Sequence, residues 1–209
     1  MVALAIGASI LSLGLAGPVA QAPAGPENLV IVEYLLPAER IVLYPRAGVL
    51  RRTSGLELSG IAQTAFDQDF MTETYYSAFA LSKSGGYGYS TTSNSLDGAR
   101  DIAMHECMSQ NTNCIIVAEI VPAGYREMQQ GDISMSPEVS DLFINPQAAG
   151  APVGVITSMA ISEDGAYALV WGHPDRQASD NAAMSDCRGN LLNYPGMREM
   201  PCVVLPPLE

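Results

Sequence analysis

The sequence predicts an α+β fold made of two ββαβ modules, each with a small antiparallel sheet, one packed helix and one disulfide. Three observations predict this fold: an internal repeat, cysteines at matching places in its two copies, and strand pairs around glycine turns. The 209 residues are 48% hydrophobic and only 15% charged, which supplies enough apolar material for packed cores.

The repeat has a spacing of 80 residues. When Ala80 is placed on Ala160, the two segments align without gaps as far as Cys107 and Cys187. Seven of these 28 positions are identical, where chance would give roughly two. The identical pairs are Ala80 and Ala160, Ser82 and Ser162, Gly85 and Gly165, Tyr87 and Tyr167, Ala103 and Ala183, Met104 and Met184, and Cys107 and Cys187.

The first copy is predicted over residues 67–122. Its two strand-like runs, YYSAFALS (75–82) and YGYST (87–91), flank the turn KSGG and indicate a hairpin. Asn94 or Ser95 is a suitable cap for a helix over residues 95–110. A third strand, CIIVAEIV, begins at Cys114.

The second copy is predicted over residues 155–209 and follows the same plan. Strands at 156–162 and 167–172 flank the turn EDGA, and Pro174 suits the first turn of the following helix. Cys202 begins the last strand, CVVL.

Residues 1–24 are predicted to be a signal peptide or another N-terminal apolar segment. The run VALAIGASILSLGLAG suits the hydrophobic region of a signal peptide, although no Lys or Arg precedes it. Ala22-Pro23-Ala24 is a suitable cleavage signal before Gly25. An apolar helix of the mature fold and an uncleaved membrane anchor are the alternatives.

Two further segments lie outside the repeat. Residues 25–66 are predicted to hold N-terminal strands and a linker, with NLVIVEYLL and RIVLY as strands around the turn PAE, and this hairpin is a candidate edge of the first copy. Residues 123–154 are predicted to connect the copies, with one short helix at Pro137–Phe143.

The repeat selects one of the three pairings that four cysteines allow. It predicts the disulfides Cys107–Cys114 and Cys187–Cys202, each joining a helix C-terminus to the start of the next strand. Two disulfides predict an oxidising compartment, periplasmic or secreted.

Composition and missing motifs exclude several functions. The net charge of −12 disfavours nucleic acid, and membrane contact is expected only if the N-terminal segment is uncleaved. No cofactor is predicted, because Lys83 is the only lysine and no phosphate-binding loop follows a strand. No metal site is predicted, since His105-Glu106 lacks a second histidine at Ser109.

The hairpins carry a candidate ligand face of four aromatic residues: Tyr87, Tyr89, Tyr167 and Trp171. An exposed aromatic face suits a glycan or a peptide, and burial in the core is the alternative. No catalytic residue is predicted, although paired carboxylates of a glycosidase type are defined by spatial separation rather than by sequence.

The order of these motifs resembles the DUF4189 family of small exported bacterial domains. The similar segments are YYSAFALSKSGGYGYS, DGARDIAMHEC and CIIVAEI in the first copy, and MAISEDGAYALVWG, ASDNAAMSDC and CVV in the second. The resemblance implies two tandem divergent copies of that fold and an exported location, and it implies no catalytic residues.

The expected function is that of an exported, non-enzymatic protein that binds a protein or glycan partner or has a structural role in the cell envelope. Two alternatives are a hydrolase that acts on envelope polymers through paired carboxylates and an accessory subunit of a membrane complex.

Overall fold

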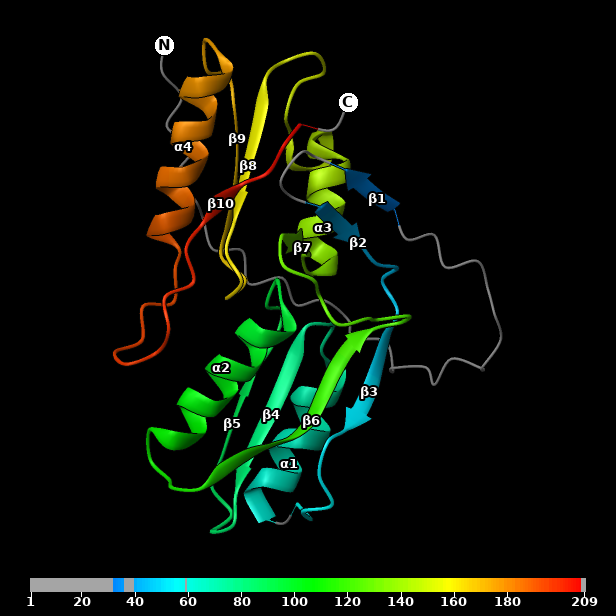
Figure 1. Ribbon diagram of the computed structural model, residues 1–209, viewed down its shortest axis with the longest axis vertical. Helices are drawn as coiled ribbons and strands as arrows, with labels where there is room; N and C mark the ends of the chain where they lie inside the picture. Colours follow the sequence, from blue (N-terminus) through cyan, green and yellow to red (C-terminus); the bar gives the residue numbers. More distant parts are fainter. Residues whose placement is uncertain (1–31, 36–39, 59, 208–209) are drawn as a thin grey trace.

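Two modules lie end to end along the long axis of the molecule, with the first copy of the repeat below and the second above (Figure 1). The structure is a computed structural model that describes residues 32–35, 40–58 and 60–207. The predicted signal segment, residues 1–24, lies outside the described residues. Within the described part of the chain, no helix has the length and apolar character needed to cross a membrane.

The first module has the predicted order of elements. Strands β4 (Ser77–Ser82) and β5 (Tyr87–Ser90) form an antiparallel hairpin, α2 (Leu96–Met108) follows, and β6 (Cys114–Pro122) pairs antiparallel with β4. A further strand, β3 (Gly48–Arg52), pairs with the other side of β6 and completes the sheet order β3-β6-β4-β5.

The second module repeats this topology with a smaller sheet. Strands β8 (Thr157–Ile161) and β9 (Tyr167–Trp171) form the hairpin, α4 (Arg176–Gly189) follows, and β10 (Val203–Val204) pairs antiparallel with β8. The order β10-β8-β9 matches β6-β4-β5 in the first module. The predicted α+β fold with two ββαβ modules is therefore confirmed.

A conserved local geometry surrounds each disulfide. Cys107–Cys114 and Cys187–Cys202 are both formed as predicted, with Cα atoms 6.2 Å apart in each. The repeated serine at the end of the first hairpin strand donates its hydroxyl proton to the carbonyl two residues before the second cysteine. Ser82 does so to Thr112 at 3.0 Å and Ser162 to Met200 at 2.7 Å.

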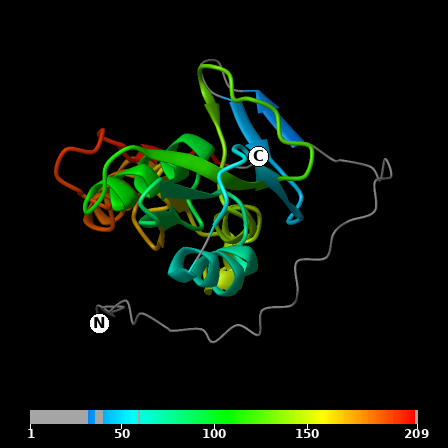
Figure 2. The ribbon, with the colours of Figure 1, turned by 90° about the horizontal axis from the view of Figure 1, so that it is seen from below.

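Each sheet also carries a second helix on its opposite face. Helix α1 (Gly60–Gln68) and the short 3-10 helix η1 (Phe70–Thr72) contribute Phe66 and Phe70 to a cluster with Phe79. Figure 2 shows α1 and α2 on opposite sides of the first sheet.

Helix α3 (Pro137–Ile144) has the same place in the second module. It packs Val139 and Phe143 against Met159 and Ile161, and the 3-10 helix η2 (Pro146–Ala149) follows it. The predicted helix in the connecting segment is therefore part of the second core. The repeat extends to a helix before each hairpin that the gapless sequence alignment does not include.

The remaining strands form a small third sheet. Strand β1 (Val32–Leu35) pairs antiparallel with β2 (Arg40–Leu43), and β2 pairs parallel with β7 (Asp132–Ile133). The N-terminal hairpin thus pairs with β7 instead of the sheet of the first module, although Val42 of β2 packs in the first core, and β3 is the strand that extends the first sheet.

Helix starts are determined by side-chain caps. The Ser95 hydroxyl accepts a hydrogen bond from the Gly98 N–H at 2.9 Å, so Ser95 and not Asn94 caps α2. Asp175 caps α4 through the Ala178 N–H at 2.8 Å, which places Pro174 before the helix instead of in its first turn.

We predict that each disulfide stabilises its module through loop closure. Changing Cys187 and Cys202 to Ala is expected to lower the free energy of unfolding by about 3 kcal/mol, and the same change at Cys107 and Cys114 by about 2.5 kcal/mol, because the first loop is shorter. Urea denaturation of both double variants measures this. Unchanged midpoints in both would contradict the structural role.

Candidate functional site

Asn94 joins the two modules through a buried set of hydrogen bonds. Its N–H donates to the Glu163 carbonyl at 3.0 Å, and its Nδ2 donates to the Ser162 carbonyl at 2.9 Å. Its carbonyl accepts from the Ser134 hydroxyl at 2.9 Å, and its Oδ1 accepts from the Ser136 N–H at 3.0 Å. Asn94 is only 1% exposed, so no solvent replaces these bonds.

Two glycines let the backbones of the modules approach each other. A Cβ at Gly98, in the first turn of α2, would lie 2.3 Å from the Glu163 carbonyl oxygen. Gly165, in the turn of the second hairpin, has φ +100, and a Cβ there would lie 2.8 Å from the Thr92 carbonyl oxygen. The turn of the second hairpin therefore docks on the segment that leads from β5 into α2.

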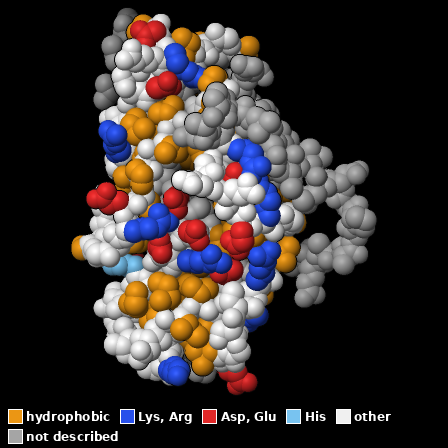
Figure 3. Space-filling model, in the orientation of Figure 1, with side chains coloured by type: hydrophobic (Ala, Val, Ile, Leu, Met, Phe, Trp, Pro, Cys, Tyr) orange, Lys and Arg blue, Asp and Glu red, His pale blue; other side chains and the backbone are white. Residues whose placement is uncertain are grey.

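The loop between α4 and β10 adds a second bridge to the first module. Arg198 forms ion pairs with Asp101 on α2 and with Glu163, and both carboxylates raise the pKa of Arg198. The Tyr194 ring stacks on His105 of α2 with ring centroids 4.8 Å apart. Figure 3 shows acidic and basic side chains gathered across the middle of the molecule, between the hydrophobic patches of the two modules.

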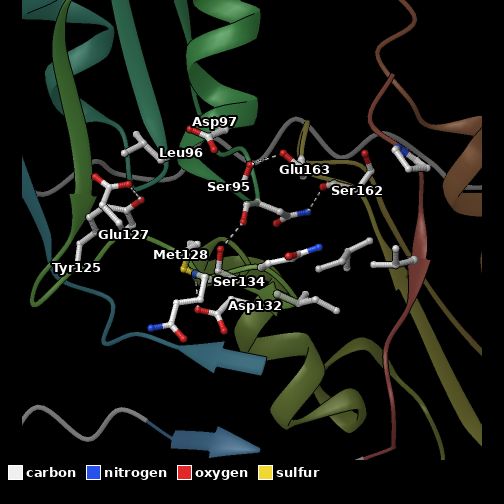
Figure 4. Close-up of a pocket in the computed structure, with 17 residues that line it drawn as sticks. Ser95, Leu96, Asp97, Tyr125, Glu127, Met128, Asp132, Ser134, Ser162 and Glu163 are labelled. Atoms are coloured by element: carbon white, nitrogen blue, oxygen red, sulfur yellow. Dashed lines mark hydrogen bonds between the residues drawn. The ribbon is translucent and has the colours of Figure 1, made fainter. Parts of the chain in front are cut away.

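A pocket of about 370 Å³ opens at this junction, within the usual range for ligand sites of roughly 300–1,000 Å³. Both modules and the segment between them line it (Figure 4). Its apolar lining comes from Leu96, Tyr125, Met128, Ile133, Ile161, Pro201 and Val203, and its polar lining from Asn94, Ser95, Asp97, Glu127, Gln129, Gln130, Asp132, Ser134, Ser162 and Glu163.

The carboxylates of the pocket are engaged by neighbouring groups. Asp132 accepts hydrogen bonds from Arg40 Nε and Arg126 Nη1, each at 2.8 Å, and from the Gln129 N–H at 2.9 Å. These donors, Arg40 above all, hold the pKa of Asp132 well below its usual range. Asp97 accepts from Arg100 at 3.0 Å. Asp132, whose carboxyl group is held ionised by these donors, is unsuited to act as a general acid.

Tyr125 forms an aromatic wall of the pocket. Its ring lies at 6.2 Å from that of Tyr44 and at 5.9 Å from that of Tyr76, measured between centroids. Burial raises the pKa of the Tyr125 phenol, with a further contribution from Glu127. The hydroxyl is therefore neutral at physiological pH, and it donates a hydrogen bond to Glu127 Oε2 at 3.5 Å.

The predicted aromatic ligand face is divided between the two sheets. Tyr87 and Tyr89 are half-buried and stack on Phe79 at centroid distances of 5.6 and 5.9 Å. Tyr167 and Trp171 lie on the edge strand of the second sheet and are 38% and 37% exposed. The junction pocket is lined by none of these four residues.

The structure offers little support for acid–base or metal chemistry in the described residues. Glu73 is a carboxyl group whose pKa is raised, by burial first and then by Glu138 and Asp69, and it lies outside the pocket. Among the described residues, no three His, Cys, Asp or Glu side chains are grouped so that they could hold a metal ion.

The junction was not predicted from the sequence, and the alignment of the two copies contains only a weak signal for it. Asn94 aligns with Pro174, and Gly98 aligns with Ala178. Asn94 and Gly98 are thus contact positions at which the two copies differ, whereas Gly165 and Ser162, which also take part in the contact, match Gly85 and Ser82. Because only seven of the 28 aligned positions are identical, differences alone would not have selected these two.

Comparisons with known proteins found no match: no family model, no curated protein and no solved structure is similar to this chain. The resemblance to the DUF4189 family therefore stays a hypothesis.

We predict that Asn94 is required for stability. The change Asn94→Asp replaces a donor by a carboxylate that faces the Ser162 carbonyl, and it is expected to cost about 2–4 kcal/mol of the free energy of unfolding. Chemical denaturation measures the loss. Asn181→Asp, at an exposed position of α4, is the matched control and is expected to be nearly neutral. Equal effects of the two changes would contradict the role of Asn94.

We also predict a pH-dependent effect of Glu73. Because its pKa is raised in the folded protein, ionisation of Glu73 opposes folding, and this cost appears as the pH rises from the unfolded pKa through the folded pKa. Glu73→Gln is therefore expected to raise the free energy of unfolding at pH 7 by less than about 1 kcal/mol, which is measured as a higher melting temperature. Below pH ~4 it is expected to have no effect. A stabilisation that is the same at both pH values would contradict this assignment.

Proposed function

We propose that this chain is an exported, non-enzymatic binding protein of the cell envelope or the extracellular space, and that a protein segment or a glycan binds in the junction pocket. The observation that carries the proposal is the pocket itself, which is lined by residues of both copies and has apolar, amide, hydroxyl and carboxylate groups in its lining. Such a mixture is typical of ligand sites, where apolar area supplies affinity and a few polar groups fix orientation.

The cysteines support an exported location. All four are paired in disulfides, and free cysteines are absent from the described residues. Disulfides of this structural kind persist in oxidising compartments such as the periplasm and the extracellular space.

The geometry of the carboxylates supports binding over hydrolysis. An acid catalyst of glycoside hydrolysis requires a carboxyl group with a raised pKa at the site. Asp132 has the opposite shift, and Glu73 lies elsewhere. We therefore do not favour the hydrolase alternative.

The test is a binding titration with soluble peptidoglycan fragments and, separately, with a library of synthetic peptides. We expect saturable binding, followed by calorimetry and by chemical-shift changes at Glu127 and Gln130, which are exposed residues of the pocket. The variant Glu127→Ala/Gln130→Ala is expected to weaken binding by about tenfold or more, since it removes two polar contacts.

The matched control is Asp67→Ala/Gln68→Ala, a carboxylate and an amide on the exposed side of α1. Equal affinities of the two double variants would exclude the junction pocket as the site. Turnover of a peptidoglycan fragment by the wild-type protein, lost in a carboxylate variant, would overturn the non-enzymatic assignment.

A further inference from the structure

The outer edge of β9 is the feature of the fold that the proposed function leaves unused. β9 pairs with β8 along one side, over the register from Thr157 and Trp171 to Ile161 and Tyr167. Among the described strands, none pairs with its other side. An edge strand presents unpaired N–H and C=O groups, which are a template for another strand.

The hairpin register determines which residues have their polar groups on that edge. The Ser162 N–H donates to the Ala166 carbonyl at 2.8 Å, so Ala166 faces β8 with its backbone groups. Along a strand, the N–H and C=O groups of successive residues point to alternate sides. The backbone groups of Ala168 and Val170 therefore point towards β8 as well. The backbone groups of Tyr167, Leu169 and Trp171 point outward. In agreement, the Tyr167 carbonyl accepts a bond from Asn190 Nδ2 at 3.0 Å, from outside the sheet.

Apart from the bond of Asn190 to the Tyr167 carbonyl, the residues of β9 lack the features that usually prevent strand addition. Its sequence, YALVW, contains no charged residue and no proline. By contrast β3, an edge strand of the first sheet, carries the exposed residues Arg51 and Arg52. Charged side chains on an edge oppose pairing with another chain, and their absence from β9 leaves this edge open to it.

The three outward residues are symmetric about Leu169. If two β9 strands pair antiparallel with Leu169 opposite Leu169, Tyr167 of each strand lies opposite Trp171 of the other. Each of these pairs uses backbone groups that point away from β8. One β9 strand can therefore pair with β8 on one side and with the second copy of β9 on the other. The pairing also covers the two aromatic side chains that are 38% and 37% exposed, as cross-strand aromatic pairs.

We infer that this protein forms a homodimer through β9, in which the two second modules share one continuous antiparallel sheet in the order β10-β8-β9-β9-β8-β10. The outward set has an aromatic residue at each end, Tyr167 and Trp171, so a second copy supplies an aromatic partner for both, which favours a second copy of this chain as the occupant of the edge. Each copy has a net charge of −12, whereas the strand itself is uncharged. Salt screens repulsion between the copies, so the dimer is more stable at higher ionic strength.

The experiment is analytical ultracentrifugation of the full chain over a range of concentrations, at low and at physiological salt. We expect a monomer–dimer equilibrium with a lower dissociation constant at higher salt. Amide hydrogen exchange of Leu169 and Trp171 is expected to slow as the protein concentration rises, because their N–H groups become bonded in the dimer.

Trp171→Lys places a charge on the edge and is expected to raise the dissociation constant of the dimer by at least about tenfold. The matched control is Ile61→Lys, since Ile61 is an exposed hydrophobic residue of α1 in the first module, and it is expected to dimerise like the wild type. Thermal melting of both variants confirms that they are folded.

Three outcomes would overturn the inference. The first is a monomer at every concentration with rapid exchange at Leu169. The second is a dimer whose dissociation constant is the same in Trp171→Lys and in the wild type. The third is protection of the Leu169 amide only when a peptide of another protein is added, which would assign the edge to a different partner.

Discussion

The structure depends on one buried asparagine. Asn94 uses its N–H, its carbonyl and both atoms of its side-chain amide to hold the second hairpin and the segment before α3 against the first module. The orientation of the amide is determined by its partners, because an N–H can only donate and a carbonyl can only accept. No other side chain of this size satisfies that combination, since an aspartate lacks the donor. The relative position of the modules, and hence the shape of the pocket between them, follows from this residue.

The contact between the modules is asymmetric, although the modules share a fold. It joins the β5–α2 connection of the first copy to the hairpin turn of the second. In the second copy, the positions equivalent to Asn94 and Gly98 are Pro174 and Ala178. Proline has no side-chain amide, and the Cβ of an alanine at the Gly98 position would collide with the docked turn. The second copy cannot accept a hairpin in the same way, so the junction and its pocket occur once in the part of the chain that the structure describes.

Much of the fold could be predicted from the sequence, because strand alternation, glycine turns and cysteine spacing are local signals. Each of these signals occurs in both copies of the repeat. The order of elements in each module and both disulfides came from those signals. Helix α1 and strand β3 were missed, because their identity depends on tertiary contacts. The apolar face of α1 is short, with only Ala62, Ala65 and Phe66, and it is buried by packing against Phe79 and its neighbours. Strand β3 is a strand because it pairs with the edge of β6. The junction pocket was missed for the same reason, since it exists only when two distant segments meet.

The junction and the two modules are held together by different interactions. Each module is a small sheet between two helices, and its core is stapled by a disulfide within its own ββαβ unit. The junction, in contrast, is held by hydrogen bonds and by the ion pairs of Arg198, which belongs to the loop enclosed by Cys187 and Cys202. That disulfide restricts the conformations of the loop and so keeps Arg198 close to Asp101 and Glu163. The second disulfide therefore supports both the core of its module and the contact of its loop with α2 of the first module.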